Sequence, residues 1–357
     1  MLNVSVPLNN LSFGHVGINI LRELYNRGDS VNLFSVGGVV DLKGYDIPED
    51  FGFWIHSCIG RAKKLYKNTD PTFKLWHIDG AQESISSRQG LMTFHEVDSL
   101  TAEEINILRN QHKVFVSSKF SEEVFTKAGL TNVVYCPLGF DAAHFHKVPK
   151  EPRDKVTFAL FGKFEKRKHT EKVIKAWLSR YKNDPGYELN LHVYNPFFTP
   201  EQNNQILLNI FGGTRPWNVN PIGYVDTLVQ FNNAINYADI VLDMSGGESW
   251  SIPSFTAVAL GKHAVLHNCN AIKDWAEDSG AVLIEPNGKE LVYDGVFFKQ
   301  GMDRNQGSIF TFDESEFLAG CEQTVQSFKK NPLNEKGLAL QEKFTWARTV
   351  NIIKDNL

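Results

Sequence analysis

The strongest chemical signal in the sequence is a carboxylate, Glu248, in a turn between a predicted strand and a predicted helix. The apolar run 238–244 has the composition of a buried strand. Two glycines then break it, and Pro253 suits the first turn of a helix, where no backbone N–H is needed. The backbone N–H groups of Ser251 and Ile252 would then favour an anion, together with the helix dipole. A carboxylate beside that anion would suit sugar hydroxyls, so the stretch predicts a site for a nucleotide sugar.

A basic loop that follows another predicted strand could bind the same phosphates. Residues 162–169, GKFEKRKH, come after an apolar strand and precede an amphipathic helix. Lys163 and Lys168 offer compact positive charge, and Arg167 could supply a planar guanidinium that binds two phosphate oxygens at once. This loop and the turn at Glu248 should lie on one edge of the sheet, so we expect a diphosphate cradle. The alternative interpretation is a solvated basic turn.

The N-terminal half supplies further candidates. His95 follows the predicted strand 91–94, and the carboxyl ends of parallel strands face the crevice in which such sheets bind ligands. The alternative for this histidine is a capping or core role. The first loop, residues 9–17, contains Gly14 and His15 and could approach a ligand closely. It lacks the dinucleotide fingerprint G-x-G-x-x-G, so a simple turn at Gly14 is the alternative.

Composition excludes several classes of function. The 357 residues suffice for two ordinary domains, and the formal net charge of −4 argues against a protein that mainly neutralises nucleic-acid phosphates. The four cysteines are widely spaced without a metal-ligand pattern, so we expect reduced thiols in a cytoplasmic protein. Neither a signal peptide nor a membrane span is predicted. The sequence contains no P-loop and no Asp-x-Asp motif that could hold a divalent ion, so no metal and no cofactor are expected.

Strands and helices alternate on both sides of a Pro- and charge-rich segment, residues 146–155. This pattern predicts an α/β protein with two doubly wound halves that face a central cleft. We place the first domain at 1–150 and the second at 151–335. Within them, Asp98 is expected to cap the helix that follows it. A last helix is expected from about Asn334.

These motifs resemble those of the GT-B retaining glycosyltransferases, above all glycosyltransferase family 4. Residues 248–253, Glu-Ser-Trp-Ser-Ile-Pro, are similar to the family's Glu-Gly-Phe-Gly-Leu-Pro, and Thr256 stands in place of its second glutamate. Lys163 and Lys168 fall on an arginine and a lysine of the family. The order of elements over 116–145, which includes Pro-Leu-Gly-Phe-Asp, resembles the end of the first domain in these enzymes.

The resemblance implies a GT-B fold with two Rossmann-like domains and a helix, 336–357, that packs back on the first. It implies a retaining, metal-independent hexosyl transfer from a nucleoside diphosphate sugar, UDP- or GDP-linked, to the hydroxyl of a glycan, a small molecule or a modified nucleic acid. The implied roles are catalysis by His95, Glu248 and Lys168; diphosphate binding by Lys163, Arg167, Lys168, Ser251 and Ile252; donor-sugar binding by Glu248, Ser249, Trp250 and His95; ribose and base binding by Thr256, Tyr224 and Val225; and a phosphate and acceptor loop at Gly14 and His15.

Two other functions fit the same fold. An epimerase acting on nucleotide sugars would need an acid–base pair at the sugar, and His95 with Glu96 is the candidate pair. A non-catalytic nucleotide-sugar-binding protein would fit the departures from the family at Lys163 and Thr256. A DNA-modifying transferase is a further variant of the main hypothesis, and it would show a steep salt dependence of binding.

Overall fold

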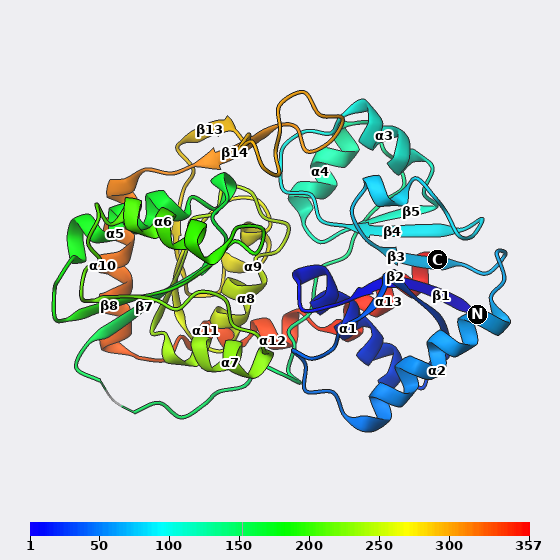
Figure 1. Cartoon of the computed structure of the whole chain (residues 1–357), viewed down its shortest axis with the longest axis horizontal. Helices are drawn as coiled ribbons and strands as arrows, with labels where there is room; N and C mark the ends of the chain where they lie inside the picture. Colours follow the sequence, from blue (N-terminus) through cyan, green and yellow to red (C-terminus); the bar gives the residue numbers. More distant parts are fainter. Residues whose placement is uncertain (152) are drawn as a thin grey trace.

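The computed structural model describes residues 1–151 and 153–357 and contains two six-stranded sheets flanked by helices (Figure 1). The strand order is β2-β1-β3-β4-β5-β6 in the first sheet and β12-β11-β10-β7-β8-β9 in the second. All pairings within these two sheets are parallel. The predicted α/β fold with two doubly wound halves is therefore confirmed.

The strands are short and mostly buried, as expected for parallel strands that are covered on both faces. The first half contains β1 Leu2–Leu8, α1 Ser12–Asn26, β2 Val31–Val40, α2 Glu49–Leu65, β3 Thr72–Leu75, η1 Asp79–Ala81, β4 Gln89–Thr93, α3 Ala102–Arg109, β5 Lys113–Val116, α4 Lys119–Lys127 and β6 Val133–Tyr135. The rest of the chain contains β7 Val156–Gly162, η2 Lys166–Lys168, α5 Thr170–Tyr181, β8 Tyr187–Val193, α6 Pro200–Ile210, β9 Val219–Pro221, α7 Leu228–Tyr237, β10 Ile240–Asp243, α8 Ile252–Ala259, β11 His263–His267, α9 Ile272–Ala276, β12 Val282–Ile284, β13 Gly288–Leu291, β14 Ser308–Thr311, α10 Glu314–Lys330, α11 Glu335–Leu338, α12 Leu340–Lys343 and α13 Trp346–Asn356.

Threonines begin several of the helices. Thr101, Thr199 and Thr227 each start a helix, and the residue three positions later completes a capping box. The prediction that Asp98 caps α3 was therefore wrong. Thr101 satisfies the free N–H groups at the start of that helix, which leaves the carboxylate of Asp98 available for another contact.

An arm of the second half reaches over to the first (Figure 1), and Asp98 of the first half contacts it. The arm, residues 288–311, contains the antiparallel pair β13–β14. Asp98 accepts hydrogen bonds from the backbone N–H of Ser308 at 2.7 Å and from Lys289 Nζ at 2.9 Å. A small apolar cluster with Val97 packs beside these contacts. The arm therefore bridges the two halves at this edge, a feature that the sequence did not predict.

Asp98→Ala is expected to loosen this arm. The substitution removes a charge-assisted hydrogen bond to the backbone of Ser308, which stabilises by about 1.5–3 kcal/mol, and a half-exposed ion pair with Lys289 that adds at most about 1 kcal/mol. Amide hydrogen exchange in residues 288–311 should therefore become roughly tenfold faster or more, while the sheets keep their protection. Glu103→Ala, on the exposed side of α3, is the matched control. Unchanged exchange in the arm of Asp98→Ala would show that other contacts hold it.

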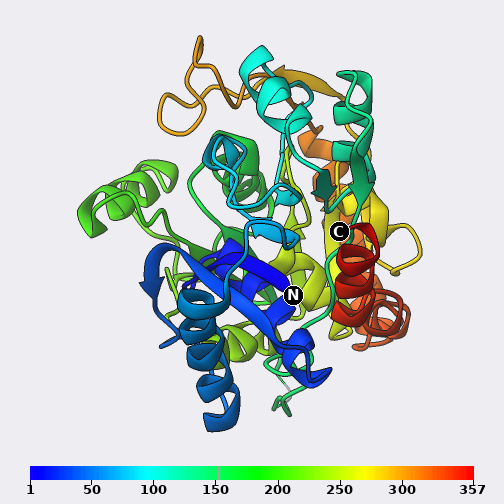
Figure 2. The same cartoon turned by 90° about the vertical axis from the view of Figure 1, so that its right-hand side faces the viewer.

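The C-terminal segment returns to the first half. Figure 2 faces that half and shows α13, in red, along its side. The guanidinium of Arg27, the residue that follows α1, donates to Asn351 Oδ1 at 2.6 Å and to the carbonyl oxygen of Ala347 at 2.8 Å. The single last helix expected from about Asn334 is instead three helices, α11, α12 and α13. The backbone is extended at Thr345 (φ −120°, ψ 147°), which separates α12 from α13, and the side chain of Thr345 caps α13.

The connection between the two sheets runs from the end of β6 to the start of β7. The predicted linker, residues 146–155, lies within it and includes Pro152, which is outside the described residues. Within residues 1–151 and 153–357, no helix has both the length and the apolar character needed to cross a membrane.

Candidate functional site

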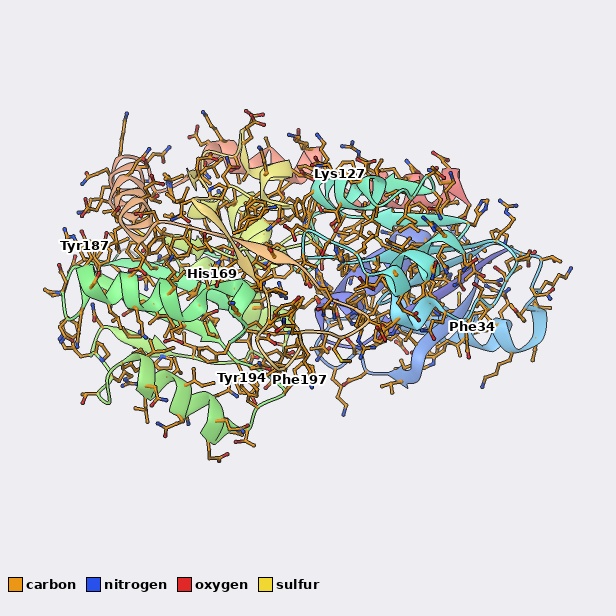
Figure 3. The ribbon with its side chains drawn as sticks, turned by 90° about the horizontal axis from the view of Figure 1, so that it is seen from above. Phe34, Lys127, His169, Tyr187, Tyr194 and Phe197 are labelled. Carbon is orange, nitrogen blue, oxygen red and sulfur yellow. The ribbon has the colours of Figure 1, made fainter. Side chains whose placement is uncertain are left out.

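A cavity of about 320 Å³ lies between the two halves. It is lined by residues that follow β1 and β4 of the first sheet and β7, β8 and β10 of the second, so the carboxyl ends of both sheets face it. Figure 3 labels Tyr194 and Phe197 in the segment after β8, near the place where the two halves meet. The charged side chains that line the cavity are those of Glu96, Lys163, Arg167, Lys168, Asp226 and Glu248.

Glu248 lies in the turn between β10 and α8. Its carboxylate pairs with Lys168 Nζ and, at 3.4 Å, with Arg167 Nη1. Only 6% of the residue is exposed. Burial raises the pKa of Glu248, and the positive charges of Lys168 and Arg167 oppose that rise. The negative charge of Glu248 is therefore balanced by protein cations instead of by water.

Arg167 connects the basic loop to both walls of the cavity. Its guanidinium lies 2.9 Å from a carboxylate oxygen of Glu165 and 3.2 Å from one of Glu96, and it donates to the carbonyl oxygen of Gly247 at 2.8 Å. Burial alone would lower the pKa of Arg167, but the carboxylates of Glu96, Glu165 and Glu248 raise it above its ordinary value. Since Glu96 belongs to the first half, this cation joins the two halves.

Lys163 is the most loosely held of the three cations. Its Nζ lies 3.6 Å from the nearest oxygen of Glu165, beyond hydrogen-bonding distance, and 38% of its side chain is exposed. It also lies 5.8 Å from the centre of the Phe197 ring. Lys163 is therefore free to move toward an anion that enters the cavity.

Helix α8 begins at the cavity wall, where Ser251, Ile252 and Pro253 line it. Ser251 has a left-handed backbone (φ 62°), and its hydroxyl and that of Ser254 both donate to the buried carboxylate of Asp243. These bonds fix the turn that leads into the helix. The N–H of Ile252 has no partner within the helix, so it is available to an anion.

Comparison with known proteins gives structural relatives only. No protein-family model matches this sequence, and no curated protein sequence matches it. Sucrose-phosphate synthase from Thermosynechococcus elongatus is 14% identical with a TM-score of 0.65, over 99% of this chain and 97% of that one. Anabaena HepE in complex with UDP-glucose is 13% identical with a TM-score of 0.66, over the full length of both chains. The trehalose-6-phosphate synthase OtsA is 11% identical with a TM-score of 0.65, over 99% and 98%. This chain has the GT-B fold.

Most of the predicted site residues lie together in the GT-B cleft. They come from the basic loop after β7, from the turn before α8, from the segment after β9 and from the start of α1. The predicted residues that line the cavity are His15, Lys163, Arg167, Lys168, Tyr224, Val225, Glu248, Ser249, Trp250, Ser251 and Ile252. Their individual roles stay predictions.

The structure gives His95 a different position from the one we predicted. This histidine is not among the described residues that line the cavity. Its ring Nε2 lies 3.0 Å from the carbonyl oxygen of Ser99, and its own carbonyl accepts hydrogen bonds from the hydroxyls of Ser121 (3.0 Å) and Ser249 (2.8 Å). The ring Nε2 and the carbonyl oxygen of His95 therefore contact other groups of the protein, which corresponds to the core alternative. The neighbouring Glu96 faces the cavity instead.

Gly14 and Thr256 also lie outside the described cavity lining. A Cβ atom on Gly14 would lie 2.0 Å from the carbonyl oxygen of Asn9, so its own loop requires the glycine. Thr256 is on the second turn of α8 and is 3% exposed. The structure therefore does not bring these two residues together with the rest of the candidate site.

Sequence reasoning missed two aromatic residues at the end of β8. His192 and Tyr194 both line the cavity. The imidazole of His192 stacks on the Phe161 ring, with centroids 4.7 Å apart and planes at 14°. Burial lowers the pKa of His192 to about 4, so this ring is neutral at pH 7. The sequence does contain a signal for His192, because it lies at the carboxyl end of a predicted strand, the same pattern from which we predicted a ligand contact for His95.

Proposed function

We propose that this chain transfers a sugar from a nucleoside diphosphate sugar to an acceptor hydroxyl. The observation that carries the proposal is the gathering of Lys163, Arg167 and Lys168 with Glu248 and the N-terminus of α8 at one cavity of a GT-B fold. The cations and the helix N-terminus suit a diphosphate, and the carboxylate suits sugar hydroxyls. The structural relatives support the proposed sugar transfer, since two are named as synthases of phosphorylated sugars and the structure of HepE contains UDP-glucose.

Donor binding would exchange the partners of the basic loop. Lys168 pairs with Glu248 in this structure, and a diphosphate would take over Lys168 as its counterion. Glu248 would then accept hydrogen bonds from hydroxyls of the donor sugar, while Arg167 keeps it in place. The loosely held Lys163 would turn to the second phosphate. Arg167 would keep its place beside Glu248 throughout, so this pair would be positioned before the donor arrives, which lowers the cost of reorganisation during the reaction.

We propose further that the transfer retains configuration and needs no metal. As the bond between the anomeric carbon and the phosphate oxygen breaks, the leaving diphosphate gains negative charge, which Lys163, Lys168 and the N–H of Ile252 stabilise. The acceptor oxygen forms its new bond on the same face of the sugar, and its proton passes to the leaving phosphate oxygen. This path needs no protein nucleophile, and closure of the cleft keeps water out. NMR of the product's anomeric centre distinguishes retention from inversion.

The donor is expected to be a UDP- or GDP-linked hexose and the enzyme cytoplasmic. All four cysteines are buried and unpaired within the described residues, which supports a reducing compartment. Burial raises the pKa of the Cys136 and Cys321 thiols, so neither is poised as a reactive thiolate.

A panel of UDP-, GDP-, ADP-, CMP- and dTDP-sugars, without metal, tests the donor site by thermal unfolding. A ligand at 100 times its dissociation constant should stabilise the fold by about 2.7 kcal/mol, and we expect this shift with one nucleotide class only. The double variant Lys163→Ala/Lys168→Ala should lose most of the shift. If no nucleotide sugar shifts the well-folded wild-type protein, the proposed donor site is wrong.

A further inference from the structure

The two walls of the cavity differ in charge. The second half contributes three cations, Lys163, Arg167 and Lys168, and two carboxylates, Asp226 and Glu248, whereas Glu96 is the one charged side chain that the described residues of the first half contribute. The other groups on the first-half wall include Leu11, Tyr45 and Phe94, which are apolar or aromatic, and His15. Burial lowers the pKa of His15 to about 4, so it is neutral at pH 7. The first-half wall therefore combines apolar surface with a single negative charge.

His15 has a ring nitrogen without a partner. Its Nδ1 is buried and forms no hydrogen bond within the described part of the chain. Its Nε2 lies 3.3 Å from Asn19 Nδ2 and 3.7 Å from Asp141 Oδ2, so that edge of the ring is held by the protein. The ring also stacks on Tyr45, with planes at 15°. His15 lines the cavity, and buried polar atoms rarely lack a partner in native proteins, so a group of a ligand that enters the cavity can supply the partner of Nδ1.

A hydroxyl group suits this nitrogen in either tautomer of His15. If Nε2 carries the proton, Nδ1 accepts a hydrogen bond; if Nδ1 carries it, the nitrogen donates one. A hydroxyl can play the complementary part in both cases, whereas a carboxylate or phosphate oxygen can only accept. The first-half wall thus offers a position for a hydroxyl beside apolar side chains.

We propose that the acceptor is an uncharged hydroxyl compound with an apolar face, and that His15 positions its hydroxyl. This inference rests on the proposed function, in which the donor diphosphate pairs with Lys163 and Lys168 of the opposite wall while Arg167 stays with Glu248. An acceptor phosphate would then find no described cation on the first-half wall, and the Glu96 carboxylate, which is paired with Arg167, offers it no counterion. An aryl or alkyl group would instead bury its surface against Leu11, Tyr45 and Phe94.

Three acceptors that share one sugar test the proposal, each with the donor that the nucleotide panel identifies: glucose, glucose 6-phosphate and 4-methylumbelliferyl β-D-glucoside. We expect kcat/KM for the aryl glucoside to exceed that for glucose by about tenfold or more, and kcat/KM for glucose 6-phosphate to fall below that for glucose. The proposal is overturned if the aryl glucoside has no advantage over glucose or if the phosphate is the better acceptor. Failure of the proposed function is distinguishable, because the nucleotide-sugar thermal shift would then be missing.

Variants of Leu11 test the charge of the first-half wall, and a variant of His15 tests the positioning of the acceptor hydroxyl. Leu11 is 45% exposed, so Leu11→Arg adds a cation with little strain and should raise the use of glucose 6-phosphate relative to glucose by about tenfold. Leu11→Gln adds polarity without charge and should leave that ratio unchanged. His15→Phe keeps the aromatic ring and should raise the acceptor KM about tenfold while the donor thermal shift persists. An unchanged ratio in Leu11→Arg, or an unchanged KM in a folded His15→Phe, contradicts the corresponding part of the proposal.

Discussion

Lys168→Ala is expected to lower kcat/KM for sugar transfer by about 10²–10³-fold, the loss typical for a positioned group that stabilises charge in the transition state. In the structure Lys168 pairs with Glu248, a residue that is 6% exposed and whose negative charge is balanced by protein cations. Without Lys168, the departing diphosphate would have one fewer counterion. Glu248 would then be paired with Arg167 alone. The release of nucleotide diphosphate in the presence of an acceptor measures the effect.

Lys166→Ala is the matched control, two positions away in the same loop. The Lys166 ammonium contacts the carbonyl oxygen of Leu291 at 2.5 Å and a carboxylate oxygen of Glu290 at 3.1 Å, and it is not among the described residues that line the cavity. We therefore expect a rate near that of the wild type. A near-normal kcat/KM in Lys168→Ala, or equal losses of kcat/KM in both lysine variants, would contradict the proposal that Lys168 binds the donor phosphates.

The core of the candidate site could be read from the sequence because it is local. Glu248 and the start of α8 lie within a few positions of each other, and Lys163 and Lys168 belong to one loop. Parallel strands bring such loops to one edge, so the strand pattern alone placed them together. The strand order confirms this, since β7 and β10 are neighbours in the second sheet.

The contacts of His95 could not be read in the same way. Its ring and its carbonyl are both satisfied by hydroxyl and carbonyl groups, and two of these partners, Ser121 and Ser249, are distant in the chain. A strand-end position predicts which edge a side chain reaches but not which hydrogen bonds it forms there. Position alone therefore could not separate a core histidine from a ligand-binding one.

The arm 288–311 was missed for a related reason. Its sequence has no strong period, and its partner Asp98 lies about two hundred positions earlier in the chain. Asp98 is also a residue type that caps helices, so the local sequence predicts a role for it that does not involve the arm. In the structure the capping box at Thr101 fills that role instead. Contacts between the two halves, which position one wall against the other, are the part of the site that local patterns do not encode.

Asp141→Asn is expected to lower the free energy of unfolding by about 3–5 kcal/mol, as for other buried ion pairs that lose one partner. Asp141 is 3% exposed and lies behind His15. Its carboxylate accepts hydrogen bonds from His144 Nδ1 at 2.7 Å, Asn19 Nδ2 at 3.2 Å and Arg22 Nη1 at 3.3 Å. Asparagine keeps the shape but leaves the charge of Arg22 uncompensated. Urea denaturation measures the loss, and Asp355→Asn, at an exposed position of α13, is the control.

The same cluster predicts how stability depends on acid. Burial works to raise the pKa of Asp141, but the hydrogen bond from His144 and the positive charges around it, Arg22 among them, hold that pKa well below its usual range. The ionised Asp141 carboxylate therefore stabilises the fold fully above about pH 4. This stabilisation is lost as the pH falls further, because the unfolded chain takes up a proton that the folded chain does not. The lowered pKa of His15, about 4, adds a separate loss as the pH falls from about 6.5 toward 4. Asp141→Asn should flatten the stability curve below pH 4, and an unchanged slope there would show that other carboxylates cause it.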